Sequence, residues 1–201
     1  MKRLDVEIFD IKFLTKFPLT EPLILANTPV SWKMETEIER KSNMTSKSPP
    51  NITVFDIADW FLAQAKAEEK PLKPMKLQKL VYFAYGWYYA YHGKALFPET
   101  IYAFRHGPVV QELFDRFRHL KGSPITDDVE PKNIDSTIDS LLGSVWKAYE
   151  PYTDFQLSDM THSHPPWIDA YSSEEWFAVM SPESICVHFK KLLEKQSNAR
   201  S

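Results

Sequence analysis

The segment MKLQKLVYFAYGWYYAYHG, residues 75–93, is apolar around almost its whole circumference once it is wound into an α-helix. Leucine, valine, alanine and tryptophan recur along one side, and tyrosine and phenylalanine fill the opposite side. A helix that is apolar on every side is a buried helix. We therefore predict a central helix from Met75 to His92, closed by Gly93 in the left-handed conformation, around which the other elements pack.

The first turn of this helix carries polar side chains and is expected to lie at the wet end of the helix. These residues are Lys73, Lys76, Gln78 and Lys79. We interpret the aromatic side chains further along as core packing. A role in base stacking or cofactor binding is the alternative.

Apolar residues at helical spacing on both sides of the central segment predict a bundle. Thr53 is a good N-cap for a helix that ends before Pro71, and Ser181 followed by Pro182 begins a last helix through Leu193. The other helices that we predict run from Pro108 to Leu120 and from Ile134 to Tyr149. Two short pieces, residues 155–160 and 167–171, lie on either side of a proline-rich turn.

A short β-prone run, Ile101–Phe104, ends at the turn Arg105-His106-Gly107-Pro108. A second short strand near Ile125 is expected to pair with it. The fold class is therefore mainly α, a compact helical bundle around a central aromatic-rich helix with a small two- or three-stranded β element.

The chain divides into a helical domain, residues 52–196, a preceding segment, residues 1–51, and a disordered tail, residues 197–201. Prolines interrupt the apolar runs of the preceding segment, and its last residues are polar and of linker type. Two interpretations of this segment stay open. Either the functional protein begins at Met44 and residues 1–43 are a dispensable, disordered or non-native leader, or the segment is an arm that docks on a partner through Phe9, Ile11, Phe13 and Phe17.

The amino-acid composition indicates which kind of partner and which cellular compartment to expect. The 24 Lys and Arg residues against 27 Asp and Glu residues give a formal charge of -3, so nucleic acid is not the expected partner. Cys186 is the only cysteine, which excludes an internal disulfide and favours a cytoplasmic location. No stretch of about 18 uncharged apolar residues is present, so we expect no membrane span.

Three segments in this order resemble a known family. They are MKLQKLVYFAYGWY at 75–88, LF at 96–97 with FRHGPVV at 104–110, and LSDMTH at 157–162 followed by Pro166-Trp167. Together they resemble the Panacea domain of antitoxins, a group that includes SocA-like proteolytic adaptors and GepA-type phage-associated proteins, over about residues 52–195. The residues that we assign to the structural motif are Leu77, Leu80, Tyr82, Gly86, Trp87, Thr161, His162, Pro166 and Trp167. The chain has Phe104-Arg105 where the family often has a Trp-Lys pair.

The resemblance implies an antitoxin that binds and blocks a protein toxin encoded by an adjacent gene, with no catalysis, metal or cofactor. A proteolytic adaptor that delivers the toxin to a protease is the alternative. Six Trp, nine Tyr and thirteen Phe exceed what a core of this size must hide, so some should form contacts with the partner. We expect the partner-binding residues at the wet end of the central helix and in the following turn, namely Lys76, Lys79, Arg105, His106, Gly107 and Pro108.

A metal-dependent hydrolase is the alternative from another class. It would use His106, His162 and His164, with Asp159 and Asp169 near the last two. However, His162 and His164 are two residues apart, and the spacing that aims two helical ligands at one metal is four. We therefore favour a structural role in the turn for these histidines.

Overall fold

The computed structural model of the chain describes residues 52–171 and 177–198. The two interpretations of residues 1–51 lie outside the described residues, as do positions 199–201 of the expected tail. Among the helices of the described ranges, none combines the length and the apolar character that crossing a membrane requires.

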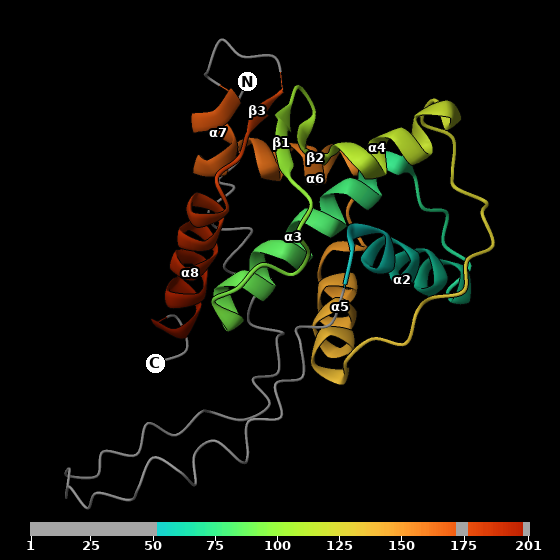
Figure 1. Cartoon of the computed structure of the whole chain (residues 1–201), viewed down its shortest axis with the longest axis horizontal. Coiled ribbons are helices and arrows are strands. Elements are labelled where there is room, and N and C mark those ends of the chain that lie inside the picture. The colour runs from blue at the N-terminus through green and yellow to red at the C-terminus, as the bar shows by residue number, and fades with distance from the viewer. Residues whose placement is uncertain (1–51, 172–176, 199–201) are drawn as a thin grey trace, which may run out of the picture.

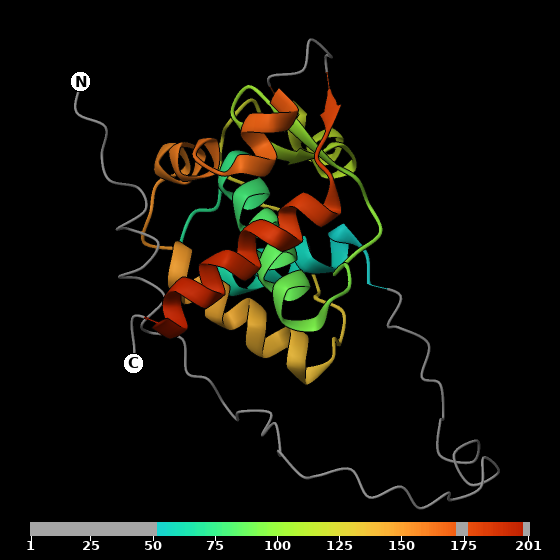
Figure 2. The same ribbon diagram turned by 90° about the vertical axis from the view of Figure 1, so that its left-hand side faces the viewer.

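Helix α3, Pro74–His92, is the centre of the fold, as predicted. It packs against α2, α4, α5, α6, α8 and strand β2, and Figures 1 and 2 show it surrounded by these elements. Pro74 occupies the start of the helix, where its missing N–H is not needed, and Gly93 closes it with a φ of 67°. Every residue from Leu77 to Tyr88 is buried.

The surrounding helices confirm a mainly helical bundle. They are α2 (Val54–Ala67), α4 (Gln111–Phe117) with the 3-10 turn η2 (Arg118–Leu120), α5 (Ser136–Tyr149), α6 (Asp154–His162), α7 (Pro165–Tyr171) and α8 (Pro182–Asn198). Thr53 caps α2 as predicted, and its capping box with Asp56 satisfies backbone N–H groups that the first turn leaves free. Ser181 accepts a hydrogen bond from the N–H of Ser184 at the start of α8.

The small sheet is antiparallel and has the strand order β2-β1-β3. The strands are β1 (Ile101–Phe104), β2 (Gly107–Val110) and β3 (Ala178–Val179). The predicted strand at Ile125 is wrong, because the third strand is β3, and the N–H of Ile125 donates instead to the carbonyl of Leu72.

The predicted start of a helix at Pro108 is also wrong. Residues 107–110 form β2, with Val109 opposite Tyr102 and Val110 opposite Ile101, and α4 begins only at Gln111. Two adjacent valines are β-branched and suit a paired strand better than a first helical turn. The chain therefore makes a hairpin between Ile101 and Val110 before α4.

Helices α3 and α8 pack closely at Gly86. A Cβ atom added there would lie 2.2 Å from a ring carbon of Phe189, which is fully buried. The Phe189 ring in turn packs edge-on against Trp87, with ring centroids 5.1 Å apart. Glycine in the middle of a helix normally destabilises it, so here it is explained by the space that the Phe189 ring occupies.

We predict that Gly86→Ala destabilises the protein by about 1–3 kcal/mol, because the added methyl group would overlap the Phe189 ring in a packed core. Gly143→Ala, in the middle of α5 with open space around its position, is the matched control and should stabilise by about 0.5–1 kcal/mol. Urea unfolding of both variants measures the two effects. Equal changes in the two variants would contradict the proposed close packing.

Candidate functional site

Two side chains of α3 hold strand β2 of the hairpin. The amide of Gln78 forms a pair of hydrogen bonds with the backbone of Val110: Nε2 donates to the carbonyl at 3.1 Å, and the N–H donates to Oε1 at 2.9 Å. Lys79 donates from Nζ to the carbonyl of Pro108 at 3.0 Å. Both side chains are buried, so the expectation of a wet end is wrong for them. They point to the hairpin because its backbone supplies the partners that buried polar groups need.

Two further side chains, one from α6 and one from α7, bind the backbone of the turn. Ser158 on α6 donates to the carbonyl of His106 at 3.0 Å, and the indole N–H of Trp167 on α7 donates to the carbonyl of Phe104 at 3.0 Å. Gln78, Lys79, Ser158 and Trp167 thus bind the carbonyl groups of every second residue from 104 to 110. We call these four residues the hairpin latch.

Glycine is required at position 107, where the side chains of Lys79 and Thr161 lie against the backbone of the turn. Its φ is 93°, and a Cβ atom there would lie 2.4 Å from Oγ1 of Thr161 and 2.8 Å from Nζ of Lys79. An L-amino acid would therefore meet both backbone strain and a clash. Thr161 is itself fixed, because its hydroxyl donates to the carbonyl of Ser158 at 2.8 Å. Gly107 thus permits the tight turn between β1 and β2.

Lys79 is buried in the latch without a carboxylate. Only 1% of its surface is exposed, and it belongs to none of the ion pairs among the described residues. Burial disfavours the charged ammonium and lowers the pKa of Lys79 to about 7. At neutral pH the charged and the neutral form of this side chain are therefore both populated.

The side chains at the tip of the hairpin are left free by this arrangement. Arg105 and His106 are exposed, because the latch holds the backbone of the turn and not its side chains. The structure therefore brings four of the predicted partner-binding residues, Arg105 to Pro108, together with Lys79, but only Arg105 and His106 reach the solvent.

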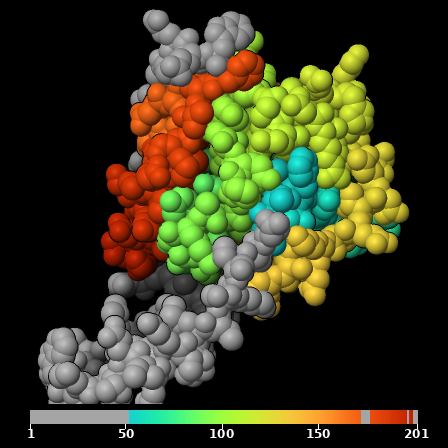
Figure 3. All heavy atoms as spheres, in the orientation of Figure 1, coloured from blue at the N-terminus to red at the C-terminus, as the bar shows by residue number. Residues whose placement is uncertain are grey.

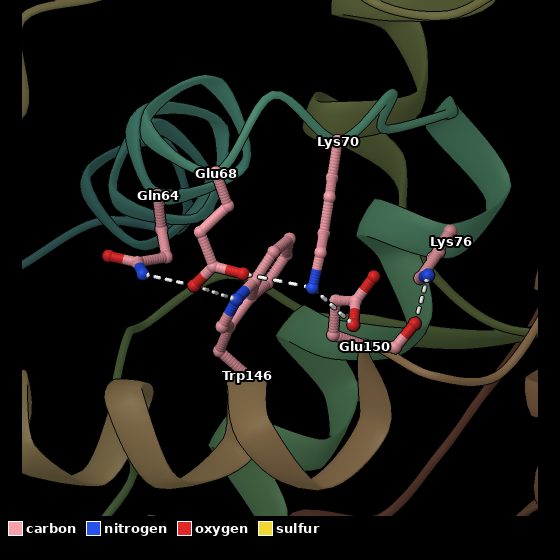
Figure 4. Close-up of polar contacts among 6 residues, drawn as sticks. All are labelled: Gln64, Glu68, Lys70, Lys76, Trp146 and Glu150. Atoms are coloured by element: carbon pink, nitrogen blue, oxygen red, sulfur yellow. Dashed lines mark hydrogen bonds and ion pairs between the residues drawn. The ribbon is translucent and has the colours of Figure 1, made fainter.

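Lys76 lies away from the hairpin. It is half-buried and donates to the carbonyl of Glu150, next to an ion pair of Lys70 with the Glu150 carboxylate at 2.8 Å (Figure 4). This contact places a cation at the C-terminal end of α5, where the helix dipole favours it. Trp146 donates to Glu68 at 2.8 Å in the same cluster. Lys76 thus helps to join α3 to α5.

A cleft of about 350 Å³ lies beside the tip of the hairpin, between the start of α3, the turn and α4. Its walls are almost entirely carbon and include Met75, Val109 and Phe117. The charged and polar groups that line it are Lys79, Arg105, His106, Arg118, Lys121 and Gln78. Figure 3 shows the hairpin (green) and α4 (yellow-green) as one continuous surface next to the start of α2 (cyan).

The three histidines of the hydrolase hypothesis lie in different surroundings. His106 is exposed, the ring of His162 packs on Trp167 with centroids 4.2 Å apart, and Nδ1 of His164 is 3.0 Å from the Tyr82 hydroxyl in the core. Burial, with a smaller contribution from His188, keeps the pKa of His164 well below its ordinary value. Within residues 52–171 and 177–198, no group of three or more His, Cys, Asp or Glu side chains is arranged to hold a metal ion. His106, His162 and His164 therefore do not form such a group in this part of the chain.

The other motif residues pack in the core around α3. Leu77, Leu80, Tyr82 and Trp87 are buried, and the indole N–H of Trp87 donates to the Tyr149 hydroxyl at 3.0 Å. Pro166 is buried at the start of α7. We did not predict from the sequence that Gln78 and Ser158 hold the hairpin, or that Arg118 and Lys121 lie beside the cleft. A glutamine and a lysine inside an otherwise apolar helix were the available signal for the latch.

We predict that Gln78→Met destabilises the protein by about 1–3 kcal/mol, since it removes both partners of the Val110 backbone while keeping a side chain of similar length. Gln111→Met is the control, because among the described residues the amide of Gln111 bonds only to Asp115, four residues on and at the surface. The control should change stability by less than about 0.5 kcal/mol. Denaturant unfolding measures both variants, and a harmless Gln78→Met would show that the latch does not hold the hairpin.

The stability of the protein should rise with pH above neutrality because of Lys79. The unfolded chain keeps this lysine protonated up to about pH 10.5, and the folded chain releases the proton at about pH 7, so the unfolded state binds more protons in between. The free energy of unfolding should then rise by up to about 1.4 kcal/mol per pH unit between pH 7 and 9.

The variant Lys79→Met should lose most of this rise, and the exposed Lys147→Met should keep it. A smaller rise from Lys76, whose pKa burial also lowers, remains in both variants. Unfolding at several pH values gives the slopes, and the same slope in Lys79→Met as in the unchanged protein would contradict the assignment.

Comparison with known proteins identifies the region that contains this site. Residues 77–168 match the family model described as the antitoxin SocA-like, Panacea domain. No curated protein and no solved structure matches the chain. The matched range includes all four latch residues and the hairpin that they hold. The part of the chain that contains the latch and the hairpin is therefore similar to an antitoxin SocA-like, Panacea domain.

Proposed function

We propose that this protein is an antitoxin that neutralises a cognate protein toxin, encoded by an adjacent gene, by binding it directly through the tip of the hairpin. The observation that carries the proposal is the exposure of Arg105 and His106 on a turn whose backbone is fixed by the latch. A surface that is ordered before binding loses less conformational entropy when the partner docks. The protein needs no catalytic group for this role.

An aromatic strip next to the turn supports the same surface. The ring of Phe104 lies 5.9 Å from that of Phe114 on α4 and 5.1 Å from that of Phe177, which precedes β3. Phe114 and Phe177 are 39% and 58% exposed. Aromatic residues and arginine carry much of the binding energy in protein interfaces. We therefore include Arg105, His106 and this aromatic strip in the contact surface.

Lys76 and Lys79 do not belong to this surface. Lys79 is buried in the latch, and the ammonium group of Lys76 is bound at the end of α5. Changing either residue would alter the fold as well as any interface, so neither is a clean test of binding.

We predict that Arg105→Glu weakens binding of the adjacent-gene toxin at least tenfold, about 1.4 kcal/mol, and restores toxicity when the two genes are co-expressed. The thermal midpoint should stay nearly unchanged, because the side chain is exposed. Lys147→Glu, an equal charge reversal on α5 away from the hairpin, should keep full protection. Titration calorimetry and growth assays make these measurements.

Two results would overturn the proposal. One is an adjacent-gene product that is harmless alone, and the other is a product that stays lethal when this protein is present. Pulse-chase measurement of the toxin distinguishes blocking from delivery to a protease, since the toxin's lifetime falls only in the adaptor role.

A further inference from the structure

The size and the lining of the cleft beside the hairpin tip suit one large apolar side chain. Its volume of about 350 Å³ is at the small end of the range for ligand clefts. Its walls are nearly all carbon, and Phe114 at its margin is 39% exposed. Covering such apolar surface stabilises a complex through the hydrophobic effect.

The rim of this cleft is positively charged. Arg105, His106, Arg118 and Lys121 line it, and none of the described residues in its lining is Asp or Glu. Arg105 and Lys121 form no ion pair with another described residue. Within the described part of the chain, Arg118 pairs only with Asp115, at 3.6 Å and in an exposed position, where an ion pair contributes little. Most of the positive charge around the cleft is therefore available to a partner.

The apolar walls and the basic rim together indicate which class of partner the cleft can bind. A basic segment would be repelled by the rim, and like charges brought together cost binding energy. A nucleic acid backbone would meet the rim but would leave the carbon walls without an apolar partner, and the chain as a whole has a formal charge of -3. An acidic peptide segment that carries an aromatic side chain satisfies both features.

We infer that this cleft holds an aromatic side chain from an acidic segment of the toxin, whose carboxylates lie against Arg105, Arg118 and Lys121. This inference rests on the proposed function and specifies the chemistry of the partner. The latch makes the cleft a preformed site, because the hairpin wall is bound to α3, α6 and α7. The aromatic group supplies the anchor, and the carboxylates supply orientation and a faster approach.

The first experiment uses labelled peptides of equal length with the full chain. Fluorescence anisotropy compares an acidic peptide of glutamates around one tryptophan, the same peptide with alanine in place of tryptophan, and a peptide of lysines around one tryptophan. The acidic tryptophan peptide should bind at least tenfold more tightly than either of the others. Equal binding by the alanine or the lysine peptide, tighter binding of a single-stranded oligonucleotide, or no binding at millimolar peptide would overturn the inference.

The second experiment uses variants of the cleft and the adjacent-gene product. Met75→Trp fills the cleft, and Arg118→Gln with Lys121→Gln removes two charges from its rim. Lys147→Gln with Lys190→Gln removes two exposed charges elsewhere and is the matched control. Both cleft variants should bind the product at least tenfold more weakly, and the control should bind normally. The double variant keeps the test valid if Met75→Trp fails to fold.

The two proposals fail in different ways. If the unchanged protein does not bind the adjacent-gene product, the proposed function fails and the peptide comparison alone decides the nature of the cleft. If the product binds the unchanged protein and both cleft variants equally well, the inference about the cleft fails and the antitoxin function stands.

Discussion

The fold depends on the burial of α3 on every side. A helix that is apolar all round cannot lie on a surface, so each neighbour covers one part of it, and the aromatic rings of α3 interlock with those of α5 and α8. Phe83 stacks on Tyr149 at 3.9 Å, and Gly86 makes room for Phe189. The positions of α5 and α8 follow from these contacts.

The same constraint explains the hairpin latch. Gln78 and Lys79 lie on a buried helix, so their polar groups must find partners inside the protein, and the backbone of β2 provides them. A hairpin of two four-residue strands is marginal in isolation. Side chains from three helices fix it here, and they leave the side chains at its tip exposed.

The residues that build the domain are therefore distinct from those whose side chains are available to contact a partner. The segments that resemble the Panacea domain supply the latch, the buried glycines Gly86 and Gly107 and aromatic side chains of the core. Arg105 and His106 lie in the same matched range, but the latch uses only the backbone at these positions. The type of side chain at these two positions can therefore change to match a partner without disturbing the fold.

The sequence by itself determined the central helix, the cap at Thr53, the turn at Gly107 and the mainly helical class, because these follow from local periodicity and from backbone preferences of single residues. It did not determine that Pro108 belongs to a strand, since only pairing with β1 distinguishes the two valines after it from the start of a helix. Nor could it show that Lys79 is buried, that Lys76 is bound at α5, or that a basic-rimmed cleft lies beside the hairpin. Those features depend on contacts between residues far apart in the chain, and these contacts exist only once the helices have packed.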